Sequence, residues 1–143
     1  MKIDENNRLR SKKRILIAKV GLDGHDRGAK IIINFLKESG YQVIYSGLHK
    51  TPEQIVNIAI QEDVDAVGIS ILSGSHTELV SQFFAELNSK SLSKILVFIG
   101  GAIPSYDFNV LKGLGVDELF PTGTEITSVL FWLDKTLQIS NSK

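Results

Sequence analysis

The sequence predicts an α/β fold built on a parallel sheet, because strand-like apolar runs alternate with helix-like segments along its 143 residues. Two apolar runs, 66–72 and 94–99, are continuous, as is typical of central strands that are covered on both faces. Right-handed crossovers between such strands favour a doubly wound, five-stranded sheet in the flavodoxin-like (Rossmann-like) order 2-1-3-4-5.

The predicted strands and helices alternate in units of about 25 residues, the length of a strand plus its crossover helix. The predicted strands are 14–19, 42–46, 66–72, 94–99 and 118–120. The predicted helices are 27–39, 52–63, 75–89, 104–111 and 125–137.

Helix-end signals define the first two helices. Gly40 suits the left-handed residue that ends the first. Thr51 is a good N-cap for the second, where Pro52 takes the first helical position and Gln54 completes a capping box.

Similar signals define the remaining helices. Ser75 and Glu78 predict a second capping box, and Gly113 and Gly115 are expected to end the fourth helix. The last helix carries one apolar stripe, formed by Ile126, Val129, Leu130 and Leu133.

Composition excludes several classes of function. Lys plus Arg equals Asp plus Glu at 16 each, so no net charge attracts nucleic acid or an anionic membrane. The absence of cysteine excludes disulfides, zinc–thiolate sites and iron–sulfur clusters. No apolar run reaches the roughly 20 residues of a membrane span. We therefore expect one domain, 14–138, between a flexible N-terminal tail, 1–13, and a C-terminal tail, 139–143. We expect it in the cytoplasm, with an organelle matrix as the alternative.

Four loops lie where this fold binds ligands, beyond the carboxyl ends of the strands. They are 21–28, 70–75, 100–104 and 121–124, and all are rich in glycine, serine or threonine. Their backbone can approach a ligand closely, which suits a large flat or extended molecule.

The first loop concentrates reactive groups. Its glycines match neither the dinucleotide nor the phosphate-loop pattern. His25 follows Asp23 by two residues, and a metal-ligating histidine usually donates its second ring N–H to a carboxylate. Lys19, at the end of the strand, is placed to stabilise that carboxylate. A lone histidine can be an axial ligand only to a metal already held by a macrocycle, so the spacing leaves open whether His25 is a ligand or an exposed loop residue.

Two other histidines and the single tryptophan have simpler expected positions. His49 is expected to be solvated. His76, at a helix start, is expected at the surface, with a pocket-lining role as the alternative. Trp132 is expected in the core or at an interface.

Three motifs together carry a family resemblance. Asp23-x-His25-x-x-Gly28, Ser70-x-Leu72 and Gly100-Gly101 resemble the signatures of the cobalamin-binding domain of adenosylcobalamin-dependent acyl-CoA mutases. The segments 19–30, 51–53 and 100–104 are similar to the methylmalonyl-CoA mutase subgroup in particular. The resemblance extends over 14–137.

The resemblance implies a cobalt corrinoid bound with its base displaced. His25 would be the lower axial ligand of cobalt, tuned by Asp23 and Lys19, with no residue acting directly on the substrate. The displaced dimethylbenzimidazole tail would lie in a slot beside the third strand. The implied cofactor-binding residues are Gly21, Leu22, Asp23, Gly24, His25, Asp26, Arg27, Gly28, Ser70, Leu72, Ser73, Gly74, Gly100, Gly101, Phe120, Gly123 and Thr124. The subgroup usually reads Phe-Gly-Pro-Gly-Thr where this chain has 120–124, so contacts at Pro121 and Thr122 stay open.

The family's substrate domain, a TIM barrel, has no counterpart in this sequence. The resemblance therefore implies a small subunit of an isomerase, inactive alone, that supplies adenosylcobalamin to a large TIM-barrel subunit in a hetero-oligomer. The implied reaction is a radical rearrangement of the carbon skeleton of an acyl-CoA. The alternatives are a corrinoid carrier and a cobalamin-dependent sensor or chaperone. A phosphorylated receiver domain of the same fold would need an acidic residue at the end of the third strand, where this chain has Ile69-Ser70-Ile71-Leu72.

Overall fold

A computed structural model describes residues 5–20, 27–71, 76–90 and 94–139. It confirms the predicted fold: a five-stranded, wholly parallel sheet in the order β2-β1-β3-β4-β5. The strands are β1 (Arg14–Lys19), β2 (Gln42–Tyr45), β3 (Ala66–Ile71), β4 (Leu96–Gly101) and β5 (Glu118–Pro121). The helices are α1 (Glu5–Arg10), α2 (Arg27–Glu38), α3 (Pro52–Gln61), α4 (His76–Lys90), α5 (Phe108–Leu114) and α6 (Ile126–Thr136), and a 3-10 turn, η1 (Ser105–Asp107), precedes α5.

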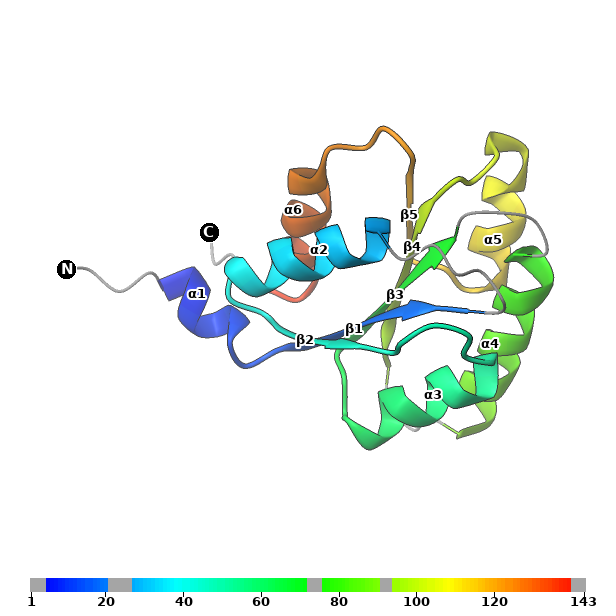
Figure 1. Ribbon diagram of the computed structural model, residues 1–143, viewed down its shortest axis with the longest axis horizontal. Coiled ribbons are helices and arrows are strands. Elements are labelled where there is room, and N and C mark those ends of the chain that lie inside the picture. The colour runs from blue at the N-terminus through cyan, green and yellow to red at the C-terminus, as the bar shows by residue number, and fades with distance from the viewer. Residues whose placement is uncertain (1–4, 21–26, 72–75, 91–93, 140–143) are drawn as a thin grey trace.

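Helices cover both faces of the sheet (Figure 1). Ile15 and Ile17 of β1 pack toward α2 and α6, whereas Leu16 and Ala18 pack toward α3, α4 and α5. Successive side chains of a strand point to opposite faces, and here both faces are core. This double burial is the reason that the central strands are continuous apolar runs.

Most of the predicted helix ends are confirmed. Thr51 and Gln54 form the reciprocal capping box, with N–H to side-chain oxygen distances of 3.1 and 2.9 Å. Gly40 and Gly115 adopt positive φ angles of 113° and 125°. Gly113 instead lies inside α5, because the helix continues to Leu114, which packs against the core. The expected Ser75 cap lies outside the described residues.

Two other boundaries differ from the prediction. Strand β4 begins at Leu96 and continues to Gly101, because the backbone of Gly100 and Gly101 pairs with Ser70 and Ile71 of β3. The fourth predicted helix is displaced toward the carboxyl end, since Ser105–Asp107 form the 3-10 turn and α5 follows from Phe108.

Within the segment 1–13, for which the sequence predicts a flexible tail, residues 5–10 form α1. Arg10 donates two hydrogen bonds to the carboxylate of Asp134 in α6, at 3.0 and 2.6 Å. Tyr41 donates a third to the same carboxylate at 2.7 Å. The core also includes Ile139, which was expected to begin the second tail and is only 1% exposed. None of the described helices is long and apolar enough to cross a membrane.

Candidate cofactor site

The sheet register brings predicted site residues from four strands into one row. Lys19 of β1 lies beside Ser70 of β3, Ser70 beside Gly100 of β4, and Gly100 beside Phe120 of β5. This row lies near the carboxyl edge of the sheet, where parallel α/β sheets bind ligands.

Gly101, at the end of β4, contacts the end of β3 and the segment that follows β5. Its φ of +119° is a left-handed conformation, and a Cβ there would lie 1.9 Å from the carbonyl oxygen of Ile71. That carbonyl accepts a hydrogen bond from the N–H of Ala102 at 3.0 Å, while the Gly101 carbonyl accepts one from Thr122 at 2.9 Å. Because only glycine fits this contact, Gly101 lets the β4 end lie against the β3 end, and its carbonyl joins the β5 end to both.

A cavity of about 450 Å³ opens on the face of the sheet covered by α2 and α6. Seven of the predicted site residues line it: Gly28, Ser70, Gly100, Gly101, Phe120, Gly123 and Thr124. Pro121 and Thr122, whose contacts the sequence left open, line it as well.

The sequence interpretation missed the apolar wall of this cavity. That wall is contributed mainly by Ile17, Ile31, Ile32, Phe98, Ile126 and Val129. A signal was available, because β1 residues alternate between faces and the spacing of Gly28, Ile31 and Ile32 places them on one side of a helix.

An aromatic cluster forms one wall of the cavity. Phe98 and Phe120 meet edge to face, with ring centroids 6.0 Å apart, and Trp132 packs 5.7 and 5.9 Å from them. Gly68 makes room for this cluster, since a Cβ there would lie 2.4 Å from the ring of Phe98. An apolar pocket with exposed backbone and few polar groups suits a flat apolar ligand group.

Lys19 is the most deeply buried charged side chain of the described residues, at 1% exposed. Its backbone N–H donates to the Ser46 hydroxyl at 3.2 Å. A charge taken out of water in this way requires polar or charged neighbours. The end of β1, just before the loop that contains Asp23, therefore carries a buried positive charge on Lys19.

The loops expected to hold the cobalt ligand lie outside the described residues. This applies to Gly21, Leu22, Asp23, Gly24, His25 and Asp26, and equally to Leu72, Ser73 and Gly74. Arg27, by contrast, is described and is exposed at the start of α2. Across the described ranges, no three His, Asp or Glu side chains come together as a free metal site.

The other residues singled out in the sequence have clear positions. His49 is exposed, as predicted, and Trp132 packs against the core, as predicted. His76 is 8% exposed, so the surface prediction is wrong. Its Nε2 lies 2.8 Å from Oδ2 of Asp107, which is 31 positions away at the end of η1. This contact links η1 to the start of α4. Such a pairing depends on the tertiary fold and leaves no local sequence signal.

Comparison with known proteins points to one family. The sequence model of the B12 binding domain matches residues 13–130. The 2-hydroxyisobutanoyl-CoA mutase small subunit of Aquincola tertiaricarbonis is 44% identical over 117 residues, which is 82% of this chain and 86% of that protein. The mitochondrial methylmalonyl-CoA mutase of Homo sapiens is 44% identical over 113 residues, 79% of this chain, and the match spans 15% of that enzyme.

A solved structure shares the fold. A cobalamin-binding protein from Desulfitobacterium hafniense DCB-2 superimposes with a TM-score of 0.70 and 23% identity, over 84% of this chain and 58% of that one. At this identity the likeness shows the fold alone. The match of the domain model to residues 13–130, together with the small-subunit relative, shows the family. The chain belongs to the B12-binding domain family.

Proposed function

We propose that this chain is the cobalamin-binding small subunit of an adenosylcobalamin-dependent acyl-CoA mutase, an isomerase. A separate large subunit with a TIM-barrel fold would bind the acyl-CoA in a hetero-oligomer. The observation that carries the proposal is the apolar cavity of about 450 Å³, which gathers backbone from the ends of β3, β4 and β5.

The residues of the cavity fit the tail of a cobalamin. Its walls are mainly aliphatic and aromatic, with rings contributed by Phe98 and Phe120. Gly68, Gly100 and Gly101 present backbone there, and side chains at two of these positions would collide with neighbours 2.4 and 1.9 Å away. A dimethylbenzimidazole is flat, aromatic and nearly apolar, so it suits these walls.

The relatives support a subunit rather than a complete enzyme. The relative that this chain covers over 86% of its length is named as a small subunit. In the methylmalonyl-CoA mutase the matching region is 15% of the polypeptide. Both relatives are mutases that act on acyl-CoA compounds, which supports the reaction class proposed for this chain.

Three residues would hold and tune the cobalt. His25 would supply an imidazole ligand to the cobalt, and Asp23 would accept the other ring N–H, which raises the basicity of the ligand. Lys19, buried at the end of β1, would stabilise the negative charge of the Asp23 carboxylate. When bound, adenosylcobalamin supplies radical chemistry through homolysis of its cobalt–carbon bond. The apolar wall of the cavity would keep water away from the cofactor tail.

Electron paramagnetic resonance of the chain loaded with cob(II)alamin tests the role of His25. Histidine labelled with the heavy nitrogen isotope distinguishes a protein ligand from the cofactor's own base. We expect the label to change the nitrogen splitting of the wild-type complex, and His25→Ala to abolish that change. His49→Asn, in an exposed loop, is the matched control and should behave as wild type. A splitting that is insensitive to the label in the wild-type chain would exclude the axial role.

A further inference from the structure

The cavity lies between two rims, one on α2 and one on the connection that precedes α6. One rim is the first turn of α2, where Gly28 lines the cavity and a Cβ would meet no described atom outside the helix's own backbone within 4 Å. The opposite rim is the connection from β5 to α6, with Thr122, Gly123 and Thr124. Among the described residues, no side chain closes over the α2 rim at Gly28.

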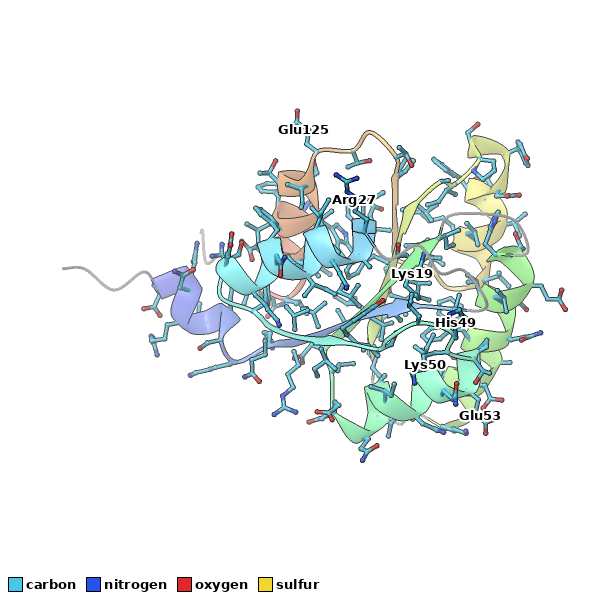
Figure 2. All side chains as sticks on the ribbon, viewed as in Figure 1. Lys19, Arg27, His49, Lys50, Glu53 and Glu125 are labelled. Atoms are coloured by element: carbon cyan, nitrogen blue, oxygen red, sulfur yellow. The ribbon has the colours of Figure 1, made fainter. Side chains whose placement is uncertain are left out.

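Arg27 stands on this open rim, directly before Gly28. Its side chain is exposed, and no hydrogen bond or ion pair joins it to any other residue in the described part of the chain. Figure 2 shows Arg27 at the start of α2, on the side of the β5–α6 connection, and Glu125 directed outward beyond that connection. Within the described ranges, the guanidinium is thus a cation without a partner, on the rim of an apolar cavity.

We propose that Arg27 binds the phosphodiester of the cobalamin nucleotide tail. This inference rests on the proposed function. A base placed in the cavity remains tethered to the corrin through ribose and a phosphodiester, so an anion must lie outside the apolar walls. A guanidinium offers paired donors that match phosphate oxygens, and the positive end of the twelve-residue helix α2 adds attraction for an anion there.

The neighbouring charges are consistent with this role. Lys30 lies one turn further along α2 and is exposed as well. Glu125 lies on the opposite rim, where its carboxylate points away from Arg27 and does not neutralise it (Figure 2). Of the described residues in the first turn of α2, the charged ones, Arg27 and Lys30, are both cationic.

Binding of two corrinoids to matched variants tests the inference. Cob(II)alamin carries the nucleotide tail and cob(II)inamide lacks it, so only the first can use a phosphate contact. We expect Arg27→Gln to weaken cob(II)alamin binding by about tenfold, the value of one charge-assisted hydrogen bond, and to leave cob(II)inamide binding unchanged. Lys37→Gln, at the other end of the same helix, should change neither affinity.

The outcomes separate this inference from the function on which it rests. Equal weakening of both corrinoids by Arg27→Gln would overturn the phosphate assignment, since the effect would then arise at the corrin or in the fold. No weakening of either would overturn it too. A wild-type chain that binds neither corrinoid would instead contradict the proposed function. The difference in cob(II)alamin affinity between wild type and Arg27→Gln should also decrease with added salt, because salt screens a charge contact near solvent.

Discussion

Substitution of Gly68 by alanine should damage the cavity without unfolding the protein. Gly68 lies in the middle of β3, and the added Cβ would be 2.4 Å from the Phe98 ring and 3.0 Å from Ile17. Carbon atoms in contact prefer a separation of about 3.5–4 Å, so the ring must move by about 1 Å. The cavity is open space beside the ring, and the ring should move into it.

The cost follows from how the ring is held. Phe98 is 4% exposed and packs edge to face with Phe120 and Trp132. Overpacking of a core costs about 1–3 kcal/mol, and the open side of Phe98 favours the lower part of this range. We therefore expect Gly68→Ala to lower the free energy of unfolding by about 1–2 kcal/mol. The displaced ring should also take space from the ligand and weaken cob(II)alamin binding by about tenfold or more. A tenfold change in affinity corresponds to about 1.4 kcal/mol of binding free energy.

Trp132 provides the assay, because it is the single tryptophan of the chain and contacts two rings of the cavity wall. Its fluorescence should report both urea unfolding and quenching by a bound corrinoid. Gly113→Ala is the matched control, since it adds the same methyl group inside α5, where the Cβ would meet no described atom outside the helix's own backbone within 4 Å. That change should stabilise the protein by about 0.5 kcal/mol. Unchanged stability and affinity in Gly68→Ala would refute the packing argument, and lost stability with unchanged affinity would refute the displacement into the cavity.

Two further predictions concern the contact between α1 and α6. Asp134→Ala should lower the free energy of unfolding by about 3 kcal/mol in urea titrations, because it leaves the largely buried Arg10 guanidinium and the Tyr41 hydroxyl without their acceptor. The control is Arg8→Ala, which removes an exposed ion pair and should lower the free energy of unfolding by under about 1 kcal/mol. Equal losses in the two variants would contradict the argument. Burial first, and then the bond to Asp134, raise the pKa of Tyr41 well above its ordinary value, so the folded state keeps a proton that the unfolded state loses. Stability should therefore fall as pH rises above about 10, more steeply in wild type than in Tyr41→Phe, and parallel pH profiles would count against it.

The architecture was accessible from the sequence because its causes are local or periodic. Continuous apolar runs mark strands buried on both faces, and the order 2-1-3-4-5 is one of the few that right-handed crossovers allow for five such strands. The capping box of Thr51 and Gln54 is likewise a contact over three residues. The site loops could be placed at one edge because parallel strands all end on the same side.

Contacts between distant positions were not accessible in this way. The docking of α1 depends on Arg10 and Asp134, which are 124 residues apart, and the burial of His76 depends on Asp107. A short polar segment such as 5–10 has weak helix signals of its own, so tertiary packing decides its structure.

The sequence by itself determined the strand order, the edge that carries the site, the family resemblance and the candidate cobalt ligand His25, since motifs and periodicity are properties of the linear chain. Only the tertiary structure decided that the ends of β3, β4 and β5 enclose one apolar cavity with α2 and α6. It also placed Pro121 and Thr122 on that cavity and Arg27 at its rim. The physical reason is that a cavity is the space left when side chains from distant segments pack, and no single segment encodes its walls.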